Sequence, residues 1–194
     1  LEKAAASSSG RKNINLKFML YDCYISEGNN TKAVEMLTEI LSYEKNNEKA
    51  LTALAAYYSS SKNGDKLTEL IRTYKGTDGE KYLKSYMVTS PTASDAAGNY
   101  TKALDLEITS PDGYAIYYTL DGSNPTVKST LYTAMIHLVK GTTTVKAVAV
   151  NNIGTASDIL ELKYVIEYKA PDAPELSPAT GKTYEEGQKI TITN

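Results

Sequence analysis

The fold of the second half of this chain is decided by the stretch Ile116-Tyr117-Tyr118-Thr119-Leu120-Asp121-Gly122-Ser123-Asn124-Pro125-Thr126. It predicts a strand through the two tyrosines, then a tight turn, and then the start of another extended segment. An Asp-Gly pair tolerates the positive φ angles of tight turns, and Pro125 fixes φ and stops strand pairing. The stretch therefore indicates a β-rich domain.

Short strands and turn signals surround this stretch on both sides. Leu104, Leu106 and Ile108 alternate with acidic residues, which is the pattern of a half-buried strand. Further strands are expected over residues 135–139, 144–150 and 159–166, separated by Gly- and Asn-containing turns. Strands of this length and spacing are typical of a β-sandwich.

The Tyr-Thr-Leu-Asp-Gly-Ser-Asn-Pro-Thr run also resembles the signature of the chitobiase/β-hexosaminidase C-terminal domain. Further motif elements follow in order: Ser129 with Tyr132, the strand 145–149, and Gly154 with Ser157. The resemblance covers residues 90–168 and implies a small fibronectin/immunoglobulin-like β-sandwich of the kind appended to many bacterial surface and carbohydrate-active proteins. In glycosidases that carry such a module, the catalytic carboxylates belong to a separate barrel, so the resemblance implies a non-catalytic module.

The residues before position 88 have a helical pattern instead. Apolar residues recur at three- and four-residue steps, the period of one helix face. The four stripes lie in residues 16–24, 33–41, 50–58 and 67–74, and residues 78–88 suggest a fifth, capping helix. Asn- and Gly-containing breaks separate them, so we expect an antiparallel helical domain.

These helices resemble tetratricopeptide repeats. The positions where that repeat has its packing residues are held by Leu20, Tyr24, Gly28, Ala33 and Leu37. Gly64 follows Gly28 by 36 residues (64 − 28), near the roughly 34-residue period, with an apparent insertion at 59–62. The resemblance implies a protein or peptide partner for the helical repeats. A generic antiparallel helical bundle is the alternative.

The last residues echo the start of the β-region. Tyr184 is followed by apolar residues six and eight positions later, at Ile190 and Ile192, and Tyr100 is followed in the same way at 106 and 108. We therefore expect the chain to be a fragment of a longer protein with three parts. They are a tetratricopeptide-like helical domain (1–88), a chitobiase C-terminal-like β-sandwich (89–169), and a linker with the first strand of a truncated second β-module (170–194).

Composition argues against several classes of function. A net charge of −2 offers no basic field for nucleic acid, and no segment is apolar and long enough to span a membrane. The lone Cys23 excludes an internal disulfide, and it lies on an apolar helix stripe. His137 is the only histidine, which disfavours His-based metal sites and a Ser-His-Asp triad, and residues 121–124 lack the spaced acids of a calcium loop. We expect no catalytic residue, metal or cofactor.

Tyrosine is the one unusual feature of the composition, with 16 Tyr against one Phe and no Trp. An apolar ring with a polar tip suits a sugar-facing surface as well as ordinary strand pairing. The candidate ligand-binding residues are Tyr117, Tyr118 and Tyr132. Because adjacent strand residues point to opposite faces, Tyr117 and Tyr118 cannot both face outward.

Taken together, these patterns predict a multi-domain chain, helical first and β-sandwich second. We expect the chain to be a non-catalytic interaction or scaffold fragment of a bacterial cell-surface protein. The expected location, extracellular or at the cell surface, follows from the family resemblance. One alternative is a carbohydrate-binding accessory module that takes a cell-wall glycan. Another is a cytosolic tetratricopeptide adaptor, and a hydrolase is disfavoured.

Overall fold

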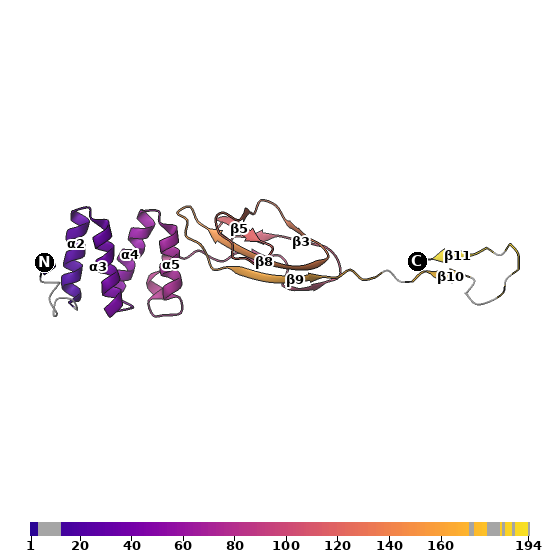
Figure 1. Ribbon diagram of the computed structural model, residues 1–194, viewed down its shortest axis with the longest axis horizontal. Coiled ribbons are helices and arrows are strands. Elements are labelled where there is room, and N and C mark those ends of the chain that lie inside the picture. The colour runs from indigo at the N-terminus through magenta and orange to yellow at the C-terminus, as the bar shows by residue number, and fades with distance from the viewer. Residues whose placement is uncertain (4–12, 171–172, 178–182, 184, 188, 194) are drawn as a thin grey trace.

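The computed structural model describes residues 1–3, 13–170, 173–177, 183, 185–187 and 189–193. Its helices stand side by side in chain order, the β-sandwich follows beyond the last of them, and a two-stranded pair lies at the far end (Figure 1). The order of a helical part followed by a β-part agrees with the prediction.

Each of the four α-helices within residues 13–74 begins after an asparagine. The four helices are α2 (Ile14–Ser26), α3 (Asn30–Tyr43), α4 (Glu48–Ser60) and α5 (Gly64–Tyr74). The side-chain oxygen of each capping asparagine accepts a hydrogen bond from the amide three residues later, which satisfies a donor that the helix itself leaves free. The four caps are Asn13, Asn29, Asn47 and Asn63.

The helices repeat with a period of 34 residues. Adding 34 to both ends of α2 gives both ends of α4, and adding 34 to the caps Asn13 and Asn29 gives the caps of α4 and α5. The turns also match, because the amides of Asn29 and Asn63 each donate a 2.8 Å hydrogen bond to a tyrosine carbonyl five residues earlier. Two similar helix–turn–helix units therefore follow one another, although α5 ends at Tyr74, three residues before the position equivalent to the end of α3 (43 + 34 = 77).

This period corrects the repeat alignment that was expected from the glycines. The structural counterpart of Gly28 is Lys62 (62 − 28 = 34), and the two share a positive φ, 70° and 54°. The pairing of Gly28 with Gly64 and the insertion at 59–62 were therefore wrong. Glycine is the usual residue at a left-handed position after a helix, and the alignment failed because a lysine occupies that position in the second repeat.

The fifth helix expected over 78–88 is also wrong as an α-helix. Two 3₁₀ turns stand there, η2 (Glu80–Tyr82) and η3 (Lys84–Tyr86). The chain enters them very close to the helices: a Cβ on Gly79 would lie 2.8 Å from the Tyr74 ring and 2.9 Å from Leu51. This crowding favours the tighter 3₁₀ turn. Leu83 is nevertheless fully buried and packs at the end of the helical core.

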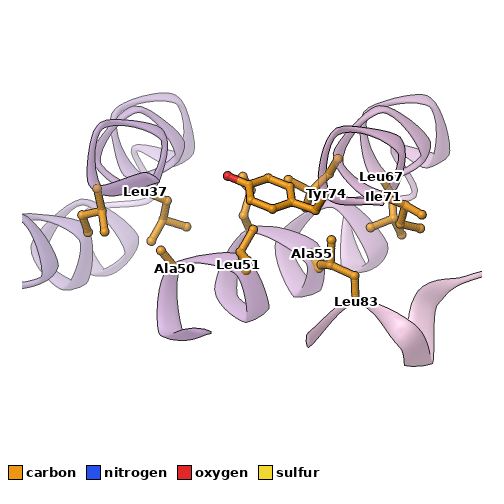
Figure 2. Packing of buried hydrophobic residues seen from close by; sticks show 11 residues of the cluster. Leu37, Ala50, Leu51, Ala55, Leu67, Ile71, Tyr74 and Leu83 are labelled. Carbon is orange, nitrogen blue, oxygen red and sulfur yellow. The ribbon is translucent and has the colours of Figure 1, made fainter. Parts of the chain in front are cut away.

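The helical core is a continuous cluster of aliphatic side chains with one tyrosine (Figure 2). Leu37, Leu51 and Leu67 come from three successive helices and are fully buried, and Tyr74 and Leu83 complete the cluster from α5 and the 3₁₀ turns. Full burial of one such leucine contributes about 1.5–3 kcal/mol. Helices α3 to α5 and the 3₁₀ cap thus share one core, whereas Leu20 and Tyr24 of α2 form a separate buried cluster with Ala33.

The β-domain is a sandwich with one large sheet. That sheet has the order β2-β9-β8-β5-β6, in which β2 is parallel to β9 and the other neighbours are antiparallel. Its strands are β2 (Gly98–Tyr100), β5 (Ala115–Thr119), β6 (Thr130–Leu131), β8 (Gly141–Val150) and β9 (Leu160–Ile166). The quoted stretch supplies β5 and the turn after it, as predicted.

The opposite layer is built from two antiparallel pairs. β1 (Thr92–Ala93) pairs with β4 (Ile108–Thr109), and β3 (Leu104–Leu106) pairs with β7 (Ile136–Leu138). The single strand expected over 104–108 is therefore divided between two partners. Leu106 and Ile108 from this layer pack in one cluster with residues such as Val145 and Tyr164 from the large sheet.

Beyond the sandwich, β10 (Glu175–Ser177) and β11 (Thr191–Thr193) form a separate antiparallel pair. Both strands are exposed. The expected echo at Gly181, Lys182 and Tyr184 lies outside the described residues.

Candidate interaction surfaces

The turn that follows β5 is held by its own side chains. The Asp121 carboxylate accepts hydrogen bonds from the hydroxyl and the amide of Ser123, at 2.6 and 2.9 Å, and these bonds lower the pKa of Asp121. The Thr119 hydroxyl donates to the Ser123 carbonyl at 2.6 Å, and Gly122 has a φ of 81°. The polar groups of the signature motif thus form hydrogen bonds within the turn and stabilise its conformation.

Two of the three candidate tyrosines lie together on the core side of the large sheet. The rings of Tyr118 and Tyr132 meet edge to face, with centroids 6.2 Å apart, and both pack against the sandwich core. The Tyr132 hydroxyl accepts a 3.0 Å hydrogen bond from the amide of Ile108. Tyr132 therefore connects the chain after β6 to the opposite layer.

A shallow pocket of about 500 Å³ opens beside this pair. Its lining includes Tyr118, Leu120, Asp121, Ser129 and Thr130, so it combines a ring with hydroxyl and carboxylate groups. A sugar ring could use both, because its C–H face suits an aromatic side chain and its hydroxyls suit polar ones. Of the three candidate tyrosines, Tyr118 contributes to this lining.

Tyr117 does not join the other two tyrosines. It lies on the opposite face of the sheet, in register with Val148 on β8 and Leu131 on β6. The structure therefore brings Tyr118 and Tyr132 together and keeps Tyr117 apart, so the three rings do not form one platform.

A second surface, which the sequence did not predict, lies where α5 meets the loop between β8 and β9. The backbones touch so closely that a Cβ on Gly64 would lie 2.1 Å from the carbonyl carbon of Gly154. The Thr68 hydroxyl accepts a 2.8 Å hydrogen bond from the amide of Ala156, and Ile153 packs against the helical core. The two domains thus share an interface with apolar and polar parts.

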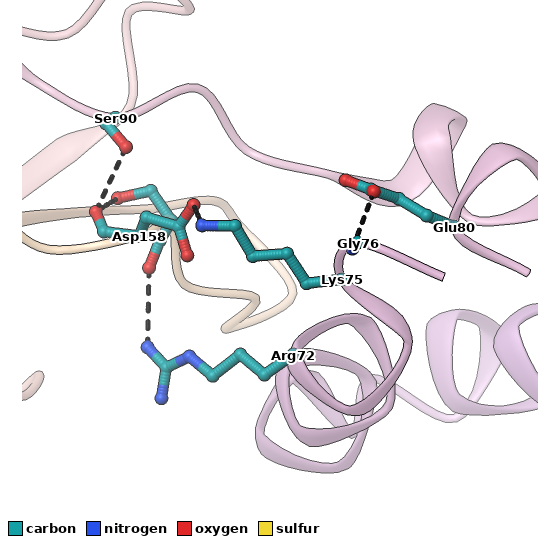
Figure 3. A network of polar contacts seen from close by, with 7 residues as sticks. Arg72, Lys75, Gly76, Glu80, Ser90 and Asp158 are labelled. Atoms are coloured by element: carbon teal, nitrogen blue, oxygen red, sulfur yellow. Dashed lines mark hydrogen bonds and ion pairs between the residues drawn. The ribbon is translucent and has the colours of Figure 1, made fainter. Parts of the chain in front are cut away.

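Charged side chains reinforce this interface (Figure 3). Lys75 forms an ion pair with Asp158, and Arg72 donates a 3.3 Å hydrogen bond to the carbonyl of Ser157. The Ser90 hydroxyl, in the segment between the domains, donates to the Asp158 carbonyl at 3.2 Å. Both the end of α5 and the interdomain segment are therefore tied to the same β-domain loop.

A groove of about 700 Å³ runs along one side of this interface. Asp65, Glu69 and Arg72 line it from α5, and Val127 and Lys128 face them from the loop after β5. Two signals in the sequence could have pointed to this region. Gly64 is a poor helix former in the first turn of a helix, and Ile153 is an apolar residue inside an Asn-Asn-Ile-Gly turn.

The residues considered for catalysis lie apart from one another. His137 projects from β7 on the exposed face, with its Nδ1 2.6 Å from the Asp105 carboxylate, and Cys23 is half-buried on α2. Hydrogen bonds lower the pKa of both Glu2 and Asp121, the direction opposite to that of a general acid in glycoside hydrolysis. Among the described residues, no three His, Cys, Asp or Glu side chains gather in a way that could hold a metal ion.

None of the described helices combines the length and the apolar character that crossing a membrane requires.

The architecture of the described residues is a helical domain joined to a β-sandwich. Within the sandwich, residues 95–161 match the family model of the chitobiase/beta-hexosaminidase C-terminal domain, which confirms the resemblance over these residues. The matched range runs from just before β2 into β9 and includes the signature turn.

Among solved structures, the chain is similar to the fibronectin(III)-like modules of Clostridium thermocellum CbhA. The identity is 15%, the alignment covers 43% of this chain and 100% of that one, and the TM-score is 0.29. No curated protein matches the chain.

Proposed function

We propose that this chain is a non-catalytic scaffold from a bacterial cell-surface protein. In this proposal the helices hold a protein or peptide partner, and the sandwich holds that partner at a set position. The family match over 95–161 supports an accessory, non-catalytic role for the sandwich. The 34-residue period of the helices supports their assignment as tetratricopeptide repeats.

The observation that carries this proposal is the interface between α5 and the β8–β9 loop. A flexible tether would leave the two domains free to reorient, whereas here Ile153 packs against the helical core and Thr68, Arg72 and Lys75 each contact the loop. Such an interface fixes the distance and the orientation between the helical domain and the sandwich. A partner bound to the helices is therefore held at a set position relative to the sandwich.

The partner surface that we propose lies on α4. Lys49, Thr52, Ala53 and Ala56 follow one another at helical steps and line an open pocket of about 710 Å³, together with Asn47 and Glu48. Small side chains on this face leave room for a peptide backbone, and Lys49 lies 4.2 Å above the Phe18 ring of α2. The lining of this surface therefore comes from the second unit of the helical repeat, and Phe18 of the first unit contacts it through Lys49.

The rigid-scaffold proposal is tested by measuring the distance between the domains. Spin labels at Glu35→Cys on α3 and Lys163→Cys on β9, in a Cys23→Ser background, should give one narrow distance distribution. An added Ile153→Asp substitution removes the apolar contact and should broaden that distribution. A broad distribution in the chain without Ile153→Asp would contradict a fixed connection.

The pocket beside Tyr118 favours a second candidate function, carbohydrate binding. Its combination of one ring with hydroxyl and carboxylate groups is a suitable lining for a sugar. The test is retention of the full chain on purified bacterial cell wall and on a panel of insoluble polysaccharides. Retention that Tyr118→Ala removes and Tyr117→Ala leaves intact would support this function, whereas no retention on any material would exclude it for those glycans.

A further inference from the structure

The β10–β11 pair repeats the β1–β4 pair in the same register. In the sandwich, Thr92 pairs with Thr109 and Ala93 pairs with Ile108. Beyond it, Glu175 pairs with Thr193, Leu176 pairs with Ile192, and Ser177 pairs with Thr191. The first strand is displaced by 83 residues (175 − 92 and 176 − 93), and the second by 84 (193 − 109 and 192 − 108).

The third pair follows the same rule. In the sandwich, the amide of Ser94 donates a 2.9 Å hydrogen bond to the carbonyl of Glu107, which extends the ladder by one residue. The same displacements carry these two residues to Ser177 and Thr191, which are paired. The local sequence agrees, because Pro-Thr-Ala-Ser at 91–94 corresponds to Pro-Glu-Leu-Ser at 174–177.

The two pairs differ in burial. Leu106 and Ile108 are 0% and 3% exposed in the sandwich core, whereas their counterparts Ile190 and Ile192 are 64% and 66% exposed. Leu176 is 39% exposed, and its counterpart Ala93 packs against the core. The apolar side chains are therefore buried by the facing sheet in the first sandwich, whereas their counterparts at β10 and β11 are exposed.

We infer that β10 and β11 open a second β-module and that their apolar side receives its remaining strands. The occupant is a set of strands equivalent to residues 111–166 of the first sandwich, whose large sheet covers Leu106 and Ile108. An isolated two-stranded pair is marginally stable in water, and cross-strand apolar pairs such as Leu176 with Ile192 gain most of their stabilisation when a facing layer excludes water. This inference is independent of the proposed partner surface on the helices.

The test supplies the expected occupant. Residues 111–169 are appended after Asn194, which corresponds to Ser110 (194 − 110 = 84), and hydrogen exchange is followed at the amides of β10 and β11. Protection of these amides should rise by at least about 100-fold over the chain without the extension, because a module core opens far less often than an isolated strand pair.

The control variant is Ile192→Asp in the extended chain, which should abolish the added protection and leave the first sandwich protected. Absence of added protection would overturn the inference, and so would protection that survives Ile192→Asp. Protection that rises with protein concentration in the chain without the extension would also overturn it, because the occupant would then be a second copy of this chain.

Discussion

Tyr132 illustrates how one hydroxyl group orders the sandwich. Its ring packs edge to face on Tyr118, while its oxygen accepts the hydrogen bond from the buried amide of Ile108 in the opposite layer. A tyrosine at this position therefore serves both packing and hydrogen bonding, although the sequence pattern equally allowed an exposed ring.

We predict that Tyr132→Phe lowers the free energy of unfolding by about 1–3 kcal/mol, because the Ile108 amide loses its acceptor in a site with little access to water. Urea unfolding of the full chain measures this loss. Tyr118→Phe is the matched control, since the Tyr118 hydroxyl has no hydrogen bond within the described residues. Equal losses for the two variants would contradict the assigned role of the Tyr132 hydroxyl.

Gly64 is required by a neighbour rather than by its own backbone conformation. It begins α5, and a side chain there would meet the backbone of Gly154 and Ile153 at 2.1–2.4 Å. Backbone cannot move aside as a flexible side chain can, so any larger residue has to separate the two domains.

Gly64→Ala should therefore open the interface despite the better helix propensity of alanine. We expect a loss of about 1–3 kcal/mol, as for other overpacked sites, together with faster hydrogen exchange at the Ala156 amide that binds Thr68. The neighbouring exposed Asp65→Ala is the control and should leave the Ala156 amide protected. An unchanged exchange rate in Gly64→Ala would refute the close contact.

The four asparagine caps are the clearest signals for where the helices start. Each supplies an oxygen to the amide three residues later, and the caps of the two repeats are spaced by 34 residues. These local signals can be recognised in a sequence because a cap and its amide are adjacent along the chain.

Asn63→Ala should reduce the free energy of unfolding by about 1 kcal/mol, since the Lys66 amide loses its acceptor at the start of α5. Asn63→Ser keeps an acceptor oxygen and should retain most of the stability. Thermal and urea unfolding measure both variants. A serine variant as unstable as the alanine variant would show that the side-chain hydrogen bond is not the cause.

The elements of the β-domain were only partly predictable. The quoted stretch with its turn identified β5, and β7 and β9 have the period-two burial that is visible in the residues themselves. The division of residues 104–109 into β3 and β4 was not visible, since it depends on two different partners, β7 and β1. The 3₁₀ turns after α5 were missed for a similar reason, because the crowding at Gly79 comes from Leu51 and Tyr74.

Alkaline pH acts on the whole molecule through its tyrosines. Burial raises the pKa of Tyr164 to about 12, and the pKa values of four tyrosines in the helical domain are raised as well. Those four are Tyr21, Tyr24, Tyr58 and Tyr74. A raised pKa in the folded state means that folding favours the neutral phenol. The contribution of these tyrosines to the free energy of unfolding is therefore fully present below their pKa in the unfolded chain, and it is lost as the pH rises toward their pKa in the folded state.

We therefore predict that the free energy of unfolding falls as pH rises from about 10 toward 12, with a slope of up to about 1.4 kcal/mol per pH unit for each such tyrosine. Urea unfolding at a series of pH values measures the slope. Tyr164→Phe should reduce the slope, even though it lowers stability at every pH by removing the hydrogen bond to the Asp95 carbonyl. An unchanged slope in that variant would contradict the role of Tyr164.

The division of the chain into a helical and a β-part, the signature turn and most strands follow from residues that are near one another along the sequence. Apolar periodicity, asparagine caps and the Asp-Gly turn are local, so their physical causes can be read without a structure. The contact of Gly64 with Gly154, the inward position of Tyr118 and Tyr132, and the register shared by β10–β11 and β1–β4 depend on segments brought together by folding. Long-range packing and hydrogen bonding decide these features, because which distant group covers or pairs with a residue is set by the arrangement of the whole chain.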